Sequence, residues 1–168
     1  RAGLQKINFG SASMLRPLMW FDQIDPRDPL QLTEGVYAVL GRYYFLNNAN
    51  IWLWALYGND NRKGWESMPS IKNQPELGGR VQIPVERGEL GTTYHYRVAD
   101  ATDTPNLPHG ASTDVREKRL AMDGKFDLGV GLWFEGVLIH QDIDLPDFSY
   151  QRMLNLGLDY TFGLGNGL

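Results

Sequence analysis

Two apolar and aromatic runs, separated by a short Asn-rich stretch, dominate residues 35–59. The run GVYAVLGRYYFL precedes NNAN, and IWLWALYGN follows it. Strand-forming residues on both sides of a short polar turn predict a β-hairpin. Bulky residues occupy both faces of its strands, so the hairpin needs apolar surroundings on at least one face. A protein core and a lipid bilayer would both meet that need.

Alternation of apolar and polar residues predicts further strands. In the clearest case Leu154, Leu156 and Leu158 share one face, and Asn155 and Asp159 share the other. No stretch combines helical periodicity with helix caps. We therefore expect an all-β fold of about eight strands. Besides the hairpin, the predicted strands cover residues 1–9, 78–86, 90–100, 116–122, 125–140 and 149–162.

The connections between these strands alternate in length. The short ones are NNAN, ERGE, MDGK and GLGNGL, and Asp123-Gly124 is a strong two-residue turn signal. Long loops at 10–32, 59–76, 101–113 and 141–148 separate them. This order is typical of an antiparallel up-and-down transmembrane β-barrel, with short turns on one rim and long loops on the other. We expect residues 1–168 to form one barrel domain or part of one.

Composition narrows the possible classes of protein. A chain of 168 residues can bury a core as one domain. A net charge of −4 with interspersed signs predicts no nucleic-acid partner, and the lack of cysteine excludes disulfides and thiolate metal sites. A transmembrane helix needs about eighteen consecutive apolar residues, and no such run is present. A transmembrane strand needs only about nine to eleven residues.

Alternating strands also build soluble up-and-down barrels, in which the apolar face points inward. Three details favour the inverted arrangement, with lipid outside. Glycines share a polar face with charge, as at Gly129, Gly131 and Glu135. Aromatics end the apolar faces, as at Tyr160 and Phe162, where membrane barrels carry girdles. The third detail is the alternating connection length. A soluble β-barrel that binds an apolar small ligand remains the alternative.

Four stretches carry a resemblance to a known family: LQKINFGSASMLRPLMWFDQIDPRDP, GVYAVLGRYYFLNNANIWLWALYGN, GGRVQIPVERGELGTTYHYR and DGKFDLGVGLWFE. They resemble Gram-negative outer-membrane porins of the alginate-export-type channel group. The resemblance implies contact with outer-membrane lipid and a passive or weakly selective channel for small hydrophilic or anionic solutes. Members of the group close with more strands than this chain supplies, so it also implies a fragment of a larger barrel. The oligomeric state stays open.

Polar residues on the predicted strands are the candidates for lining a pore. Two interpretations stand side by side for them. Charged side chains can set the ion preference of a pore, or they can pair across strands and neutralise one another. The candidate residues are Arg80, Gln82, His95, Arg97, Arg119, Asp127, Glu135, Asn155 and Asp159.

No metal, cofactor or enzymatic site is predicted. Asp22, Asp25 and Asp28 could together bind a calcium ion, but they lack EF-hand spacing and its glycine, which favours ordinary loop acids. The three histidines at positions 95, 109 and 140 lack the ligand spacing of a zinc site. Ser149 and His140 flank one loop, but nothing in the sequence sets the geometry of a catalytic triad there.

Overall fold

The computed structural model describes residues 1–12, 15–22, 35–105, 110–143, 145 and 149–160. These residues form eight strands and no helix, which confirms the predicted all-β class. Within them no helix is long or apolar enough to cross a membrane. The strands are β1 (Ala2–Gln5), β2 (Val36–Tyr44), β3 (Asn50–Leu56), β4 (Glu76–Val85), β5 (Gly88–Asp100), β6 (Asp114–Asp127), β7 (Gly131–Gln141) and β8 (Tyr150–Asp159).

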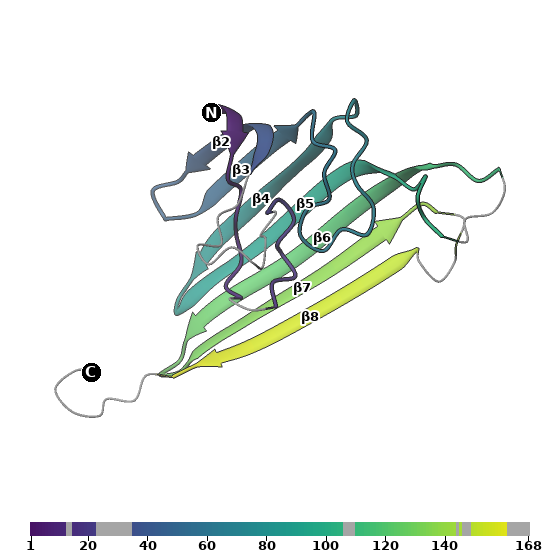
Figure 1. Ribbon diagram of the computed structural model, residues 1–168. Helices are drawn as coiled ribbons and strands as arrows, with labels where there is room; N and C mark the ends of the chain where they lie inside the picture. Colours follow the sequence, from purple (N-terminus) through teal and green to yellow (C-terminus); the bar gives the residue numbers. More distant parts are fainter. Residues whose placement is uncertain (13–14, 23–34, 106–109, 144, 146–148, 161–168) are drawn as a thin grey trace, which may run out of the picture.

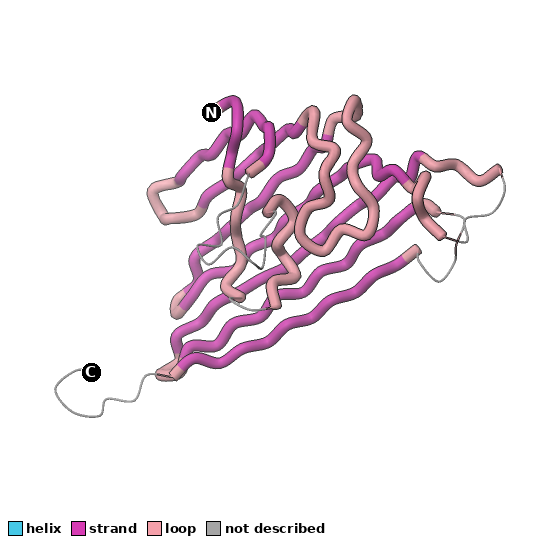
Figure 2. Tube along the Cα trace, in the orientation of Figure 1, coloured by secondary structure: helices cyan, strands magenta, loops and turns pink. Residues whose placement is uncertain are grey.

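All eight strands belong to one sheet and follow one another in chain order (Figure 1). Each strand pairs antiparallel with the next, as the up-and-down prediction required. Among the described strands the sheet is open, with β1 and β8 at its two edges, and it does not close into a barrel. Figure 2 shows the long loops gathered along one rim and the short turns along the opposite rim.

The predicted hairpin at residues 35–59 is confirmed as β2 and β3. Their connecting turn is closed by two backbone hydrogen bonds: Phe45 N–H donates to the Ala49 carbonyl at 2.8 Å, and Asn48 N–H donates to the Phe45 carbonyl at 3.1 Å. Asn48 has a φ of 64°, in the left-handed region that asparagine tolerates better than most residues. The Asn-rich stretch therefore suits the turn it makes.

The turn predicted at Asp123-Gly124 is wrong, because both residues lie inside β6. The actual turn comes a few residues later, where Leu128 N–H donates to the Val130 carbonyl at 3.0 Å and Gly129 has a φ of 85°. The side chain of Asp123 reaches Arg80 on β4, two strands away. A contact 43 residues apart in sequence thus overrides a local turn signal.

The remaining connections mostly follow the prediction. Residues 86–87 form the short turn between β4 and β5, and residues 57–75, 101–113 and 142–149 make the long connections. The stretch GLGNGL lies outside the described residues. The first strand is shorter than expected, because the chain leaves the sheet after Gln5 and buries Ile7 and Phe9 against it.

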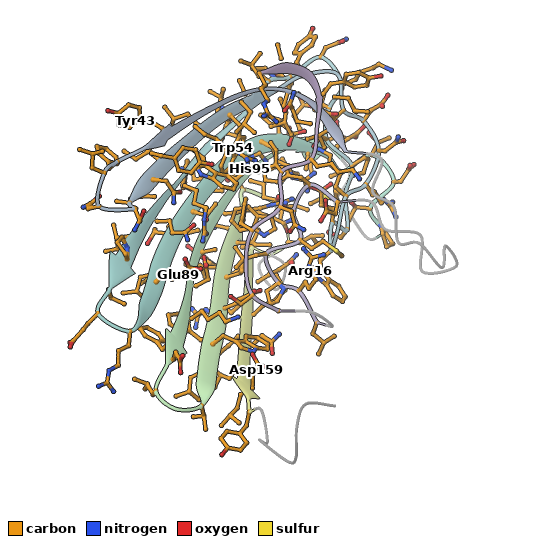
Figure 3. All side chains as sticks on the ribbon, turned by 90° about the vertical axis from the view of Figure 1, so that its left-hand side faces the viewer. Arg16, Tyr43, Trp54, Glu89, His95 and Asp159 are labelled. Carbon is orange, nitrogen blue, oxygen red and sulfur yellow. The ribbon has the colours of Figure 1, made fainter. Side chains whose placement is uncertain are left out.

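The sheet is curved, and the chain after β1 runs along its concave side (Figure 3). We call residues 6–12 and 15–22 the inserted segment. The side of the sheet that it covers is the inner face, and the opposite side is the outer face. The main core lies between them. This core joins apolar side chains of the inserted segment to apolar side chains of the sheet. The inserted segment contributes Ile7, Phe9, Leu18, Trp20 and Phe21, and the sheet contributes Val36, Ala38, Leu40, Trp54, Leu56, Ala121, Val137 and Ile139.

Candidate functional site

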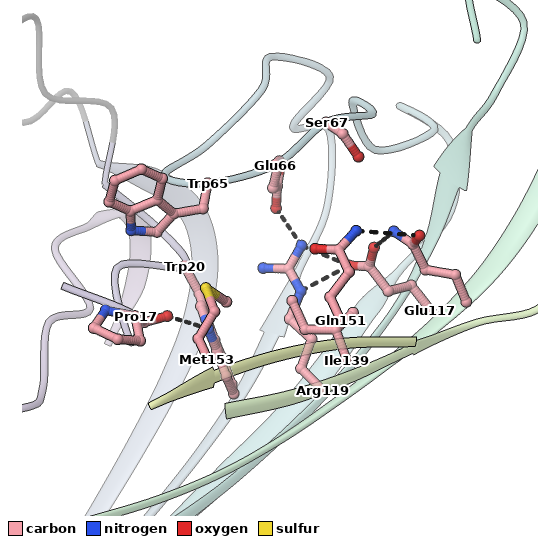
Figure 4. A pocket seen from close by; sticks show the side chains of 11 residues that line it. Pro17, Trp20, Trp65, Glu66, Ser67, Glu117, Arg119, Ile139, Gln151 and Met153 are labelled. Carbon is pink, nitrogen blue, oxygen red and sulfur yellow. Dashed lines mark hydrogen bonds and ion pairs between the residues drawn. The ribbon is translucent and has the colours of Figure 1, made fainter. Parts of the chain in front are cut away.

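The inner face carries a buried network of charged side chains centred on Glu117. Arg97 Nε and Arg119 Nε donate to Glu117 Oε1 at 2.6 and 2.7 Å, and Gln141 Nε2 donates to Oε2 at 2.6 Å. Glu66, from the long loop before β4, reaches both guanidinium groups, at 3.1 Å from Arg97 and 2.8 Å from Arg119. Figure 4 shows Glu66 and Glu117 on either side of Arg119. Each arginine is therefore neutralised by two carboxylates.

A second network links the same loop to β3, β4 and β5. Lys63 Nζ donates to Glu76 Oε1 at 2.7 Å, and His95 Nε2 lies 3.0 Å from Glu76 Oε2. Trp54 Nε1 donates to His95 Nδ1 at 3.2 Å. Because Nδ1 accepts this bond, the imidazole proton sits on Nε2 and points at Glu76. The histidine is therefore a neutral bridge between an indole and a carboxylate.

A bidentate ion pair spans β4 and β6 closer to the short-turn rim. Arg80 Nη1 and Nη2 donate to the two carboxylate oxygens of Asp123 at 2.6 and 2.7 Å, and Nη1 also donates to Thr93 Oγ1 at 2.9 Å. This parallel geometry is the strong form of an arginine–carboxylate contact. The guanidinium carbon of Arg80 also lies 5.1 Å from the ring centre of Phe9, within the range of a cation–π interaction.

Glu135 on β7 holds the inserted segment by its backbone. Its Oε1 accepts the N–H groups of Ser11 at 2.6 Å and Ala12 at 2.7 Å. Gly10, with a φ of 94°, makes this close approach possible, since a Cβ there would lie 2.5 Å from Glu135 Oε1. The other carboxylate oxygen, Oε2, is buried and has no hydrogen-bond partner among the described residues.

An aromatic cluster fixes the rest of the inserted segment to the sheet. Phe21 lies 5.4 Å from Trp54 and 5.0 Å from His95 between ring centres, and Phe9 stacks 5.9 Å from Trp54. Trp20 Nε1 donates to the Pro17 carbonyl at 3.1 Å. Burying one such ring is worth about 1.5–3 kcal/mol. The inserted segment is therefore held on the inner face by aromatic packing as well as by its backbone hydrogen bonds to Glu135.

Little free space remains where these networks meet. The cavity drawn in Figure 4 lies between Trp20, Trp65, Arg119 and Gln151 and has a volume of about 10 Å³. That is space for roughly one water molecule. A larger, open cleft of about 460 Å³ lies at the long-loop rim, with Arg62, Asp100, Asp103, Met68 and Ile143 among its lining residues.

The structure places the nine predicted pore-lining residues in three groups. Arg80, His95, Arg97, Arg119 and Glu135 converge on the buried inner face. Gln82 and Asn155 are half-buried on the same face; Gln82 Nε2 donates to Glu89, and Asn155 Nδ2 donates to the Leu15 carbonyl. Asp127 and Asp159 are exposed at the short-turn ends of β6 and β8.

Sequence reasoning missed the partners that neutralise these residues. Glu117 and Asp123 share the strand period of Arg119, so extending the alternation through β6 would have found them. Glu76 opens β4 on the face of Arg80. Lys63 and Glu66 come from an irregular loop, in which no periodic signal exists.

The candidate metal and triad residues do not assemble among the described residues. Asp22 is buried beside Arg16 at 3.6 Å; burial raises the pKa of its carboxyl, and the guanidinium opposes the rise. Asp25, Asp28 and His109 lie outside the described residues. His140 stacks on Tyr150 at 4.5 Å, and the Ser149 hydroxyl donates to the Leu145 carbonyl. No group of three metal-binding side chains occurs in the described part of the chain.

The outer face is apolar and exposed. The side chains on it that are both large and hydrophobic include Leu4, Tyr37, Val39, Tyr43, Leu53, Leu77, Val81, Ile83, Tyr94, Leu120, Met122, Leu138, Leu154, Leu156 and Leu158. The alternation along the strands thus places charged side chains on the inner face and apolar side chains on the outer face. Comparison with known proteins adds no identification: no family model, no curated sequence and no solved structure matches this chain.

Proposed function

We propose that this chain forms wall strands of an outer-membrane porin-type channel of a Gram-negative bacterium, with small hydrophilic solutes on its inner side. The observation that carries the proposal is the inverted polarity of the sheet. Arg97 and Glu117 are buried on the inner face, whereas Leu53, Leu120 and Leu154 are exposed on the outer face. A water-soluble protein rarely exposes an apolar surface of this extent, and a lipid bilayer is the solvent in which it is stable.

The lengths of β2 and of β4 to β8 fit a membrane wall, whereas β1 and β3, with 4 and 7 residues, are shorter than a full span. Strands β4, β7 and β8 have 10, 11 and 10 residues, and β5 and β6 have 13 and 14. A tilted transmembrane strand needs about 9–11 residues. The two longest strands extend past such a span at the long-loop rim, where the outer face of β6 carries Arg116 and Lys118. Charge thus returns to the outer face beyond the apolar band.

Aromatic residues border the apolar band on both sides. Tyr37, Tyr57 and Tyr150 are exposed at the strand ends nearest the long loops. Tyr43 and Tyr160 are exposed at the strand ends nearest the short turns. Tyrosine is enriched where membrane proteins cross the bilayer interfaces, because its ring is apolar and its hydroxyl is polar. The two borders support a lipid-facing assignment.

The charges of the inner face favour uncharged hydrophilic solutes over anions. Arg80, Arg97 and Arg119 could in isolation attract anions, but each is paired with at least one carboxylate. Opposite charges at these distances cancel most of the field that a solute would feel. The inserted segment and Glu66 also occupy space beside the sheet, so solutes would pass along a narrowed interior.

Quenching of tryptophan fluorescence by lipid tests the assignment of the outer face. The five native tryptophans do not lie on it: Trp20, Trp52, Trp54 and Trp133 belong to the inner side and Trp65 to a loop. We expect vesicles of dibromo-phosphatidylcholine to quench a Leu120→Trp variant strongly and the wild type weakly. Leu46→Trp, in the β2–β3 turn, is the matched control and should be quenched less than Leu120→Trp. Equal, weak quenching of all three proteins would overturn the proposal.

Planar bilayers test transport separately. Protein extracted from bacterial outer membranes should give discrete conductance steps with little preference between small anions and cations. Insertion confirmed by quenching but without steps would contradict the channel and leave the lipid-facing sheet standing.

A further inference from the structure

Three exposed basic side chains lie on the outer face, at the long-loop ends of β6 and β8. Arg116 and Lys118 are two residues apart on β6, and Arg152 is on β8. These strands pair with opposite sides of β7 (Figure 1). His140 of β7 connects them, because it is the register partner of Lys118 on β6 and of Tyr150 on β8. We call Arg116, Lys118 and Arg152 the basic patch.

The basic patch differs from the cations of the inner face in its lack of partners. On the inner face, Arg97 and Arg119 both form ion pairs with carboxylates. No side chain of the basic patch forms an ion pair or a hydrogen bond with the described part of the chain. Two acidic residues are near Arg116: Asp114 precedes it on the same face, and the Asp142 N–H donates to its carbonyl at 2.9 Å. Neither carboxylate pairs with it, so the patch keeps a net positive charge.

The basic patch directly borders the apolar part of the outer face. Leu120 follows Lys118 on the same face of β6, and Leu154 follows Arg152 on the same face of β8. Between them, Leu138 of β7 is the register partner of both Leu120 and Arg152. All three leucines are exposed. Residues on one face of a strand are spaced by about 7 Å, so one ligand can reach a cation and a leucine together.

We propose that the basic patch binds the headgroup phosphate of a membrane lipid in the leaflet next to the long loops, with an acyl chain of that lipid along Leu120, Leu138 and Leu154. The proposal rests on the proposed function for the lipid-facing orientation of the outer face. A phosphate group offers several acceptor oxygens and up to two negative charges, so it can contact cations on two strands. Each basic residue near an anionic lipid surface strengthens binding by about fivefold.

The aromatic side chains beside the basic patch suit a headgroup region. Tyr96 of β5 is the register partner of Lys118, and Tyr150 stacks on His140 with their ring centres 4.5 Å apart. A tyrosine hydroxyl can donate a hydrogen bond to a phosphate or ester oxygen, and tyrosine is enriched where headgroups meet hydrocarbon. Cations, hydroxyls and leucines thus follow one another in the order in which a lipid presents its phosphate, its ester groups and its acyl chains.

Native mass spectrometry of the full chain in micelles of an uncharged detergent tests the site. The probes are dihexanoyl-phosphatidic acid, dihexanoyl-phosphatidylcholine and inorganic phosphate, and the bound fraction is followed as each is titrated. We expect phosphatidic acid to bind about tenfold more tightly than phosphatidylcholine, because the choline cation offsets the charge of the phosphate. Inorganic phosphate should bind at least about tenfold more weakly than phosphatidic acid, because it has no acyl chain to bury against the leucines.

Two double variants separate the basic patch from general effects of charge. Arg116→Gln combined with Lys118→Gln should weaken the binding of phosphatidic acid by about tenfold or more and leave phosphatidylcholine unchanged. Arg87→Gln combined with Lys125→Gln removes two exposed cations at the short-turn rim and should keep the binding of the wild type. Arg152→Gln alone should weaken the binding of phosphatidic acid by about fivefold. All five side chains are exposed, so the fold should tolerate each change.

Three results would overturn the proposal: equal weakening by the two double variants, equal binding of the two lipids to the wild type, or inorganic phosphate binding as tightly as phosphatidic acid. The last result would identify the ligand as a free anion. The quenching experiment is independent of these measurements. Strong quenching of the Leu120→Trp variant without a preference for phosphatidic acid would reject only the headgroup site. Weak quenching with patch-dependent binding of phosphatidic acid would reject the membrane wall and leave the lipid phosphate site standing.

Discussion

The two faces of this sheet come from the same strands and have opposite chemistry. On β6, Glu117 and Arg119 point inward and are 1% and 2% exposed, while Leu120 next to them points outward and is 46% exposed. Inside, the buried charges find partners on other strands, such as Asp123 and Glu117, and on the long loop that carries Lys63 and Glu66. Outside, no part of the described chain covers the apolar side chains.

The difference shows which environment each face requires. A buried charge is tolerated only when it is paired, and the inner face meets that condition through Glu66, Lys63 and Asp123. An exposed leucine on the outer face needs no partner if the surroundings are hydrocarbon. The inner face is therefore stabilised by specific contacts, whereas the stability of the outer face depends on the solvent.

The largest expected effect comes from breaking the inner network at its centre. Glu117→Ala would leave Arg97 and Arg119 with only Glu66 as a carboxylate partner, and we expect it to lower the free energy of unfolding by about 3–5 kcal/mol. Denaturant unfolding in micelles, followed by tryptophan fluorescence, measures the change. Lys118→Ala, one residue away on the outer face, should change stability by less than about 0.5 kcal/mol. Similar effects of the two substitutions would show that the faces are not distinct.

A charge on the outer face distinguishes lipid from water as its solvent. Leu120→Arg should cost about 2–4 kcal/mol in a bilayer, because the guanidinium would lie in hydrocarbon. Refolding from denaturant into vesicles measures this cost. Leu46→Arg in the β2–β3 turn is the matched control and should cost about 1 kcal/mol or less. A cost near zero for Leu120→Arg would place the outer face in water.

The smallest expected effect concerns the contact between the inserted segment and the inner face. Gly10 and Gly129 both have a positive φ, but only Gly10 is close to another group, Glu135. Gly129→Ala should cost about 1 kcal/mol from backbone strain alone. Gly10→Ala should lower the free energy of unfolding by at least about 1 kcal/mol more than Gly129→Ala does, because the added methyl group must displace the Glu135 carboxylate. Equal costs in denaturant unfolding would mean that the segment adjusts freely.

Much of the fold could be predicted because each strand shows a local repeat of apolar and polar residues in the sequence. Alternation with period two located most of the strands and correctly placed Leu154, Leu156 and Leu158 on one face. The hairpin at residues 35–59 and the alternation of short and long connections as far as β8 are confirmed. The turn at Asp123-Gly124 failed because a strong local signal was outweighed by the contact with Arg80, which the sequence does not reveal.

Only part of the candidate site could be predicted from the sequence. The sequence identified Arg80, His95, Arg97 and Arg119 as pore-lining candidates, and the structure places all four on the inner face. The sequence left open whether these side chains face a solute or pair with other side chains. The carboxylates that decide the question for the arginines include Glu66, from a loop without any period.

The sequence by itself determined that this chain forms antiparallel strands with one polar and one apolar face, because side chains alternate along a strand whatever surrounds it. It could not say which face turns inward, since soluble and membrane sheets share the same alternation. Only the tertiary structure decided that, through the direction of curvature and the course of the inserted segment, which covers the polar face with aromatic rings and leaves the leucines uncovered.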